Sequence, residues 1–142
     1  MIHNAAARDR VEQADNLAAL LDAAHDAFED MLSVIRAHED PEDGMFISLV
    51  MAAASAADGR DAIAFAPSLP ARRLHPASAD KQPHEPGPVQ AIASRLAALS
   101  ELLAKRLTEA ARSAPIPADR TACADAARSA RDIQALLTAS GP

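Results

Sequence analysis

The 142-residue chain carries 14 basic and 20 acidic side chains, a formal net charge of −6, and alanine occupies 37 positions. This acidic balance argues against nucleic-acid binding, which needs a basic surface to neutralise phosphates. Alanine is the best helix former, while three phenylalanines and few β-branched residues leave little from which to build a sheet. The composition therefore predicts an all-α protein.

The charge is divided unevenly along the chain. Residues 1–65 carry 13 acidic and 4 basic side chains, a balance of −9, whereas residues 66–142 carry 7 acidic and 10 basic ones, a balance of +3. The pattern of each half indicates a pair of alanine-rich helices. Because opposite charges attract, we expect two helical hairpins that face one another, within one chain or between two.

A first helix is predicted over residues 8–37. Its apolar residues recur at alternating spacings of four and three, which is the pattern of a helix with one buried face. The members of this seam are Leu17, Leu21, Ala24, Phe28, Met31 and Ile35. Such a stripe needs a partner helix to cover it.

A second helix is predicted to follow, because Asp40 can cap a helix and Pro41 suits its first position. Residues 45–57 carry no charge, and Gly59 offers a left-handed stop, after which residues 60–65 are a candidate for a short helical turn before Pro67. A helix that is apolar all round is normally buried, so this helix is a candidate for the centre of the bundle. Alternatively it is a contact helix with one face left over. The residues predicted to lie at that interface are Met45, Phe46, Leu49 and Val50.

Six prolines and little apolar periodicity mark residues 67–88 as a linker. A third helix is predicted over residues 88–113. Pro115 and Pro117 then break and restart the chain, and a fourth helix follows to about residue 139. Both helices carry an apolar seam.

We therefore expect a single helical domain over residues 1–142, in which an acidic hairpin (8–66) and a basic-leaning hairpin (89–140) are joined by the proline-rich linker. The predicted fold is a four-helix up-down bundle, which is complete in one chain or else is completed or swapped in a dimer.

One group of residues in the first predicted helix has metal-ligand character. Asp22, His25 and Glu29 are spaced by three and four, which places them along one side of a helix, and Asp26 lies beside them. Bundles build metal sites from such residues, but a closed site needs three or four ligands from facing helices. The later helices supply no second histidine at matching spacing. An acidic, solvated face is the preferred interpretation, with Asp22, His25 and Glu29 as weak metal candidates.

No arrangement typical of catalysis stands out in the sequence. Cys123 is the only cysteine, which excludes an internal disulfide and fits a reducing compartment. Its apolar surroundings predict an inert, packed thiol. No glycine-rich phosphate-binding loop is present. The sequence thus predicts no catalytic residue and no cofactor.

The leading hypothesis is a non-enzymatic interaction or regulatory protein that forms a homodimer or binds a protein partner through apolar helix surfaces. One alternative is a small-ligand or metal sensor, and another is a small hydrolase-like enzyme that uses the acidic side of the first helix. No stretch is suited to a membrane helix and the first residues lack a signal core, so we expect a cytoplasmic protein. Twelve arginines against two lysines favour a GC-rich, bacterial genome.

Overall fold

The computed structural model of the protein describes residues 3–70 and 88–139. Within these ranges the chain is helical and forms no strand, which confirms the predicted all-α class. The helices in these ranges are α1 (His3–Gln13), α2 (Leu17–Ala37), α3 (Phe46–Ala64), α4 (Val89–Ser113) and α5 (Pro117–Ala139). None of them is long and apolar enough to cross a lipid bilayer.

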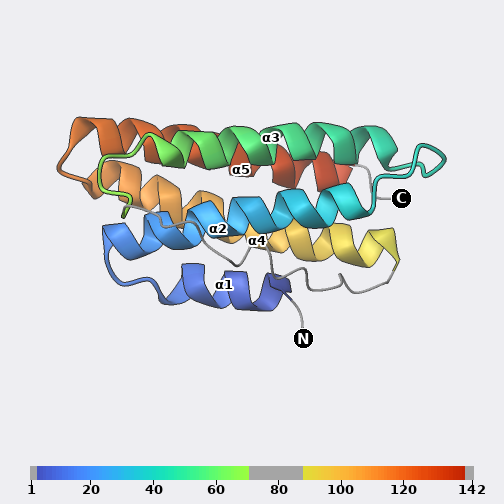
Figure 1. Ribbon diagram of the computed structural model, residues 1–142, viewed down its shortest axis with the longest axis horizontal. Helices are drawn as coiled ribbons and strands as arrows, with labels where there is room; N and C mark the ends of the chain where they lie inside the picture. The colour runs from blue at the N-terminus through green and yellow to red at the C-terminus, as the bar shows by residue number, and fades with distance from the viewer. Residues whose placement is uncertain (1–2, 71–87, 140–142) are drawn as a thin grey trace.

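Four long helices lie side by side, and the fifth, α1, lies along their outside (Figure 1). The helix α3 packs between α2 and α5, and α5 packs also against α4. The helices α2 and α4 touch each other only slightly, and α1 packs against both of them. The short N-terminal helix thus covers the seam where the other helices meet least closely.

The order of helix directions differs from the predicted up-down alternation. The helices α3 and α4 run in the same direction, so α3 ends at one end of the molecule and α4 begins at the other (Figure 1). The helix α3 is about 28 Å long, and an extended chain covers about 3.3 Å per residue. The chain between Ala64 and Val89 is therefore long enough to connect the end of α3 with the start of α4. Most of the predicted linker, residues 71–87, lies outside the described residues.

The predicted single helix over residues 8–37 is wrong, because the chain turns back between α1 and α2. Asn16 caps the new helix: its side-chain oxygen accepts a hydrogen bond from the Ala19 backbone N–H at 2.8 Å. Asparagine is among the strongest N-cap residues. Asp15 and Asn16 were therefore the available signal for the break, within an otherwise continuous helical pattern.

The predicted stop at Gly59 is also wrong, since α3 continues through it to Ala64. No glycine in the described residues has a positive φ. A Cβ atom at Gly59 would lie 2.5 Å from Cε1 of Phe28 on α2. The glycine therefore serves close packing of α2 against α3, and does not end a helix.

The apolar seams predicted from helical spacing form the core. On α2, the seam residues from Leu21 to Ile35 are buried, and Leu17 at the start of the helix is half-buried. The largest fully buried side chains come from α1 to α5 and are Phe28, Leu21, Met31, Ile35, Leu49, Ile63, Leu96, Leu99, Leu103, Leu107, Ile133 and Val11. The helices α2 and α4 each pack against three other helices, whereas α3 and α5 each pack against two.

Candidate interaction surface

The helix α3 has an apolar seam on each of two faces. The inner seam packs into the core and consists of Leu49, Ala52, Ala53, Ala56, Gly59 and Ile63. On the other side Ile47 is 64% exposed, Val50 40% and Met51 51%. Ala54 is exposed as well. These four positions, which we call the α3 outer face, follow the i, i+3, i+4, i+7 spacing of a helix surface that packs against another helix.

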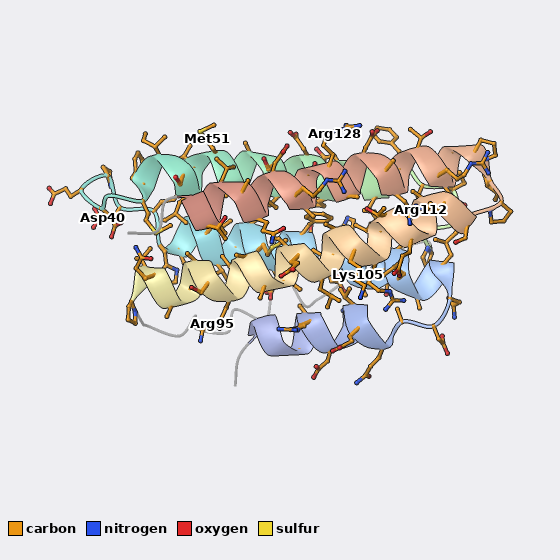
Figure 2. All side chains as sticks on the ribbon, turned by 180° about the vertical axis from the view of Figure 1, so that it is seen from behind. Asp40, Met51, Arg95, Lys105, Arg112 and Arg128 are labelled. Carbon is orange, nitrogen blue, oxygen red and sulfur yellow. The ribbon has the colours of Figure 1, made fainter. Side chains whose placement is uncertain are left out.

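Figure 2 shows the Met51 side chain pointing away from the bundle. Few large apolar side chains are so exposed in the described residues: beyond the α3 outer face, only Phe65 and Ile116 are. Phe65 directly follows α3 and Ile116 directly precedes α5, and Figure 1 shows the end of α3 and the start of α5 at the end of the molecule opposite the start of α3. The outer face therefore carries three of the five large apolar side chains that are exposed on the described surface.

The structure separates the four residues predicted to lie at an interface. Met45 and Leu49 are buried in the protein's own core, at 3% and 1% exposure, and Phe46 is half-buried. Of the four, Val50 is the exposed one. Whether any of them contacts a partner stays a prediction.

Sequence reasoning did not include Ile47 and Met51 in the interface. The helical period was the signal that could have found them. Once Leu49 faces the core, residues two before it and two after it are turned about 200° around the helix, to the opposite side. A uniformly apolar sequence hides this division, because nothing in it marks which side is buried.

Acidic side chains border the α3 outer face. Residues 29–61, which run from the second half of α2 through the following loop and most of α3, carry eight acidic residues against Arg36 and Arg60. At one end of the face the exposed acids are in the loop after α2, and at the other end they are on α3 itself. We call these residues the acidic border: Glu39, Asp40, Glu42, Asp58 and Asp61. Figure 2 shows Asp40 at the outermost tip of the molecule.

The structure brings the weak metal candidates together only in part. The ligand atoms of His25, Asp26 and Glu29 lie within 4.8 Å of one another, and these residues form the metal-type cluster found in the described part of the chain. Asp22 is instead held by Arg10 of α1, with Nη2 at 3.2 Å from its Oδ2. Asp26 thus takes the place that the sequence assigned to Asp22.

Two arginines engage this cluster. The Nη1 of Arg10 lies 2.6 Å from Oδ2 of Asp26, and the Nη1 of Arg60 lies 4.0 Å from Oε2 of Glu29. One imidazole and two carboxylates form a donor set that suits zinc. A metal ion here would have to displace the guanidinium of Arg10 from Asp26. All three donors come from one helix, so facing helices add no ligand to the cluster.

Cys123 lies on α5 and is fully buried in the hydrophobic core. Burial, and secondarily the negative charge of Asp119, raise the pKa of its thiol to about 11. The thiolate is the nucleophilic form of cysteine. The sulfur therefore stays protonated at neutral pH, in agreement with the inert, packed thiol expected from the sequence.

Comparison of the chain with protein-family models, with curated proteins and with solved structures finds no match.

Proposed function

We propose that this is a non-enzymatic interaction protein that contacts another protein through the α3 outer face. The observation that carries the proposal is the exposed apolar seam of Ile47, Val50, Met51 and Ala54 on a helix whose opposite seam is already buried. Exposed apolar patches of this kind mark association sites, and helices present i, i+3, i+4, i+7 anchors to a partner's groove. The face supplies contact area and no reactive group, so the proposal is of binding and not of catalysis.

The proposal includes a reducing compartment, such as the cytoplasm, as the place of action. Its support is the lone Cys123, which is buried and remains a thiol at neutral pH.

Site-specific photo-crosslinking tests the proposal. A photoreactive amino acid replaces Met51 in the full-length chain, which is then irradiated alone and in an extract of its host cells. We expect an adduct of discrete mass, twice that of the chain for self-association and another mass for a different protein. Ile47→Asp should abolish this adduct, because it puts a charge into the contact.

The matched controls lie outside the α3 outer face. The photoreactive group at Phe65, which is 82% exposed, should give no discrete adduct, and Ile116→Asp should leave the adduct at position 51 intact. The proposal is wrong if position 51 yields no discrete adduct under either condition. It is equally wrong if Ile47→Asp leaves the adduct unchanged.

A second candidate function, metal binding, is favoured by the closeness of His25, Asp26 and Glu29. Calorimetric titration of the full chain with zinc tests it. If the cluster binds zinc, His25→Ala removes the heat of binding, while Arg10→Ala tightens binding because it frees Asp26 from its 2.6 Å ion pair. Identical titrations of the parent chain and His25→Ala would exclude this function.

A further inference from the structure

We infer that the partner of the α3 outer face is an amphipathic helix with an apolar centre and basic residues at both ends, and not a second copy of this chain. The inference rests on the proposed function, because it takes the outer face as the contact. It adds the chemistry of the partner, which follows from the charges around the face.

The acidic border lies at both ends of the apolar seam. Glu39, Asp40 and Glu42 precede α3, and Asp58 and Asp61 follow the seam on α3 itself. Any helix laid along the seam therefore brings each of its ends beside exposed carboxylates. Charged groups at the rim of an interface act mainly on specificity and association rate.

Two arginines reduce this negative charge without removing it. Arg60 lies 3.2 Å from Asp61 and 4.0 Å from Glu29, so its charge is shared between two carboxylates. Arg36 is the other basic residue among residues 29–61, where eight acidic residues lie. The balance of this region is 2 − 8 = −6, which is as large as that of the whole chain.

A second copy fits this charge pattern badly in either orientation. If two α3 helices pair antiparallel, the loop acids of one copy meet Asp58 and Asp61 of the other. If they pair in parallel, each group of acids meets its own equivalent. Like charges placed opposite each other disfavour association, so self-pairing through this face is opposed at both ends.

A partner helix with basic residues at both ends is attracted at each end by the carboxylates of the acidic border. From the start of α3 to Asp61 there are 16 residues, which span about 23 Å at the helical rise per residue. The matching partner is therefore a helix of roughly four to five turns, apolar along one side, with Lys or Arg in its first and last turns. Attraction of this kind also raises the association rate and weakens with salt.

Two synthetic helical peptides of about twenty residues serve as probes. Both carry the same Leu/Ala face, but one has lysines and the other glutamates in its terminal turns. We expect the lysine-ended peptide to bind the full-length chain at least about tenfold more tightly in 50 mM salt, with a smaller preference in 500 mM salt. Met51→Asp should weaken binding of both peptides, because both use the apolar seam. Fluorescence anisotropy measures each affinity.

A charge-neutralised variant tests the border itself. It neutralises three of the five exposed acids of the border and leaves Asp40 and Asp61 in place. We expect it to reduce the preference for the lysine-ended peptide severalfold. The substitutions are Glu39→Gln, Glu42→Gln and Asp58→Asn. The matched control removes the same number of exposed acids from α1 and α4 and should leave the preference unchanged. Its substitutions are Asp9→Asn, Glu12→Gln and Glu101→Gln.

The outcomes separate this inference from the proposed function. If both peptides bind equally and Met51→Asp weakens both, the outer face is a contact surface but its partner is not selected by charge. If Met51→Asp changes neither binding curve, the lysine-ended peptide is held by charge alone and the inference is overturned. Concentration-dependent dimerisation that Met51→Asp abolishes would also overturn it. So would Met51-dependent binding to phospholipid vesicles, because the ligand would then be a lipid surface.

Discussion

Gly59 shows how one absent side chain sets the spacing between two helices. It lies in the inner seam of α3, where the Phe28 ring of α2 occupies the space that a Cβ atom would need. Phe28 is itself fully buried, so its ring is enclosed by the surrounding core. Glycine costs a helix interior roughly 1 kcal/mol relative to alanine, and here that cost is offset by the closer approach of α2.

We predict that Gly59→Ala lowers the free energy of unfolding by about 1–3 kcal/mol, the usual effect of overpacking, in spite of its better helix propensity. Urea denaturation measures the change. The same substitution in a Phe28→Leu background should cost less or stabilise, because the ring atom 2.5 Å from the new Cβ is gone. Equal costs in the two backgrounds would show that the ring does not limit the packing.

Cys123 links burial to the pH dependence of stability. Its pKa is about 11 in the folded protein against an ordinary value of 9.0. The folded state thus holds the proton more tightly than the unfolded state. This contribution to stability is complete below pH 9 and is lost as the pH rises toward 11.

We predict that the thermal midpoint falls more steeply between pH 9 and 11 for the parent chain than for Cys123→Ala, which has no thiol to ionise. Alkylation supplies an independent measurement. Iodoacetamide at pH 8 should modify Cys123 only at the rate at which the protein unfolds, and urea should accelerate the reaction. Rapid modification of the native protein would contradict a buried, protonated thiol.

At the scale of the element, two arginines connect α1 to the helices that it packs against. Arg10 reaches from α1 to Asp22 and Asp26 on α2. Arg106 on α4 donates hydrogen bonds to three backbone carbonyls at the end of α1. These are the carbonyls of Val11 at 2.7 Å, Glu12 at 2.9 Å and Ala14 at 2.7 Å.

The contribution of Arg106 has a clear physical basis. The last carbonyls of a helix have no partner within the helix, and they carry the negative end of its dipole. Among residues 6–13 of α1, whose side chains the structure describes, Ala7 and Val11 are the ones buried in the core. Helices this short are marginal by themselves, so α1 depends on contacts with the rest of the protein.

We predict that Arg106→Ala costs about 1–3 kcal/mol and exposes the amides of α1 to hydrogen exchange, while the protection of α3 and α5 is retained. The stability of Arg106→Lys should fall between those of the parent chain and Arg106→Ala, because lysine keeps the charge but cannot span three carbonyls. Lys105→Ala, which removes an exposed cation from the adjacent position, is the control. Uniform loss of protection in every helix would mean that α1 does not open by itself.

At the scale of the whole molecule, hydrogen bonds between Ser68, which follows α3, and Asp119 of α5 connect the two halves of the chain. Asp119 is fully buried in the first turn of α5. Its Oδ1 accepts a hydrogen bond from the Ser68 backbone N–H at 3.0 Å, and its Oδ2 accepts one from the Ser68 hydroxyl at 2.5 Å. This pair anchors the segment after α3 to α5, at the end of the molecule opposite the start of α4 (Figure 1).

We predict that Asp119→Ala destabilises the whole protein by about 1–3 kcal/mol, since it removes two hydrogen bonds to a carboxylate and leaves a part-buried N–H unsatisfied. Asp125→Ala, on the same helix, should cost less than about 1 kcal/mol, because its 3.2 Å ion pair with Arg128 is exposed. Urea denaturation followed by circular dichroism compares them. Similar costs for the two variants would argue against Ser68–Asp119 as a link between the halves.

The local pattern of the sequence was sufficient to predict the two helices of the second half of the chain. The predicted third helix agrees with α4 within one residue at each boundary, and the fourth helix ends at residue 139, as predicted. Pro117 begins α5 as its sequence position implies. The seam residues of α2 from Leu21 to Ile35 are buried as predicted, because a period of 3.6 residues decides which side chains share a face.

What the sequence by itself determined was the helical class and the spacing of the buried seams, since alanine content and periodicity act within a few turns of chain. Only the tertiary structure decided the passage of α3 through Gly59 and the exposure of Ile47 and Met51. The first depends on a distant neighbour, because the Phe28 ring of α2 fills the space beside Gly59. The side of an evenly apolar helix that remains exposed is set by which helices pack against it.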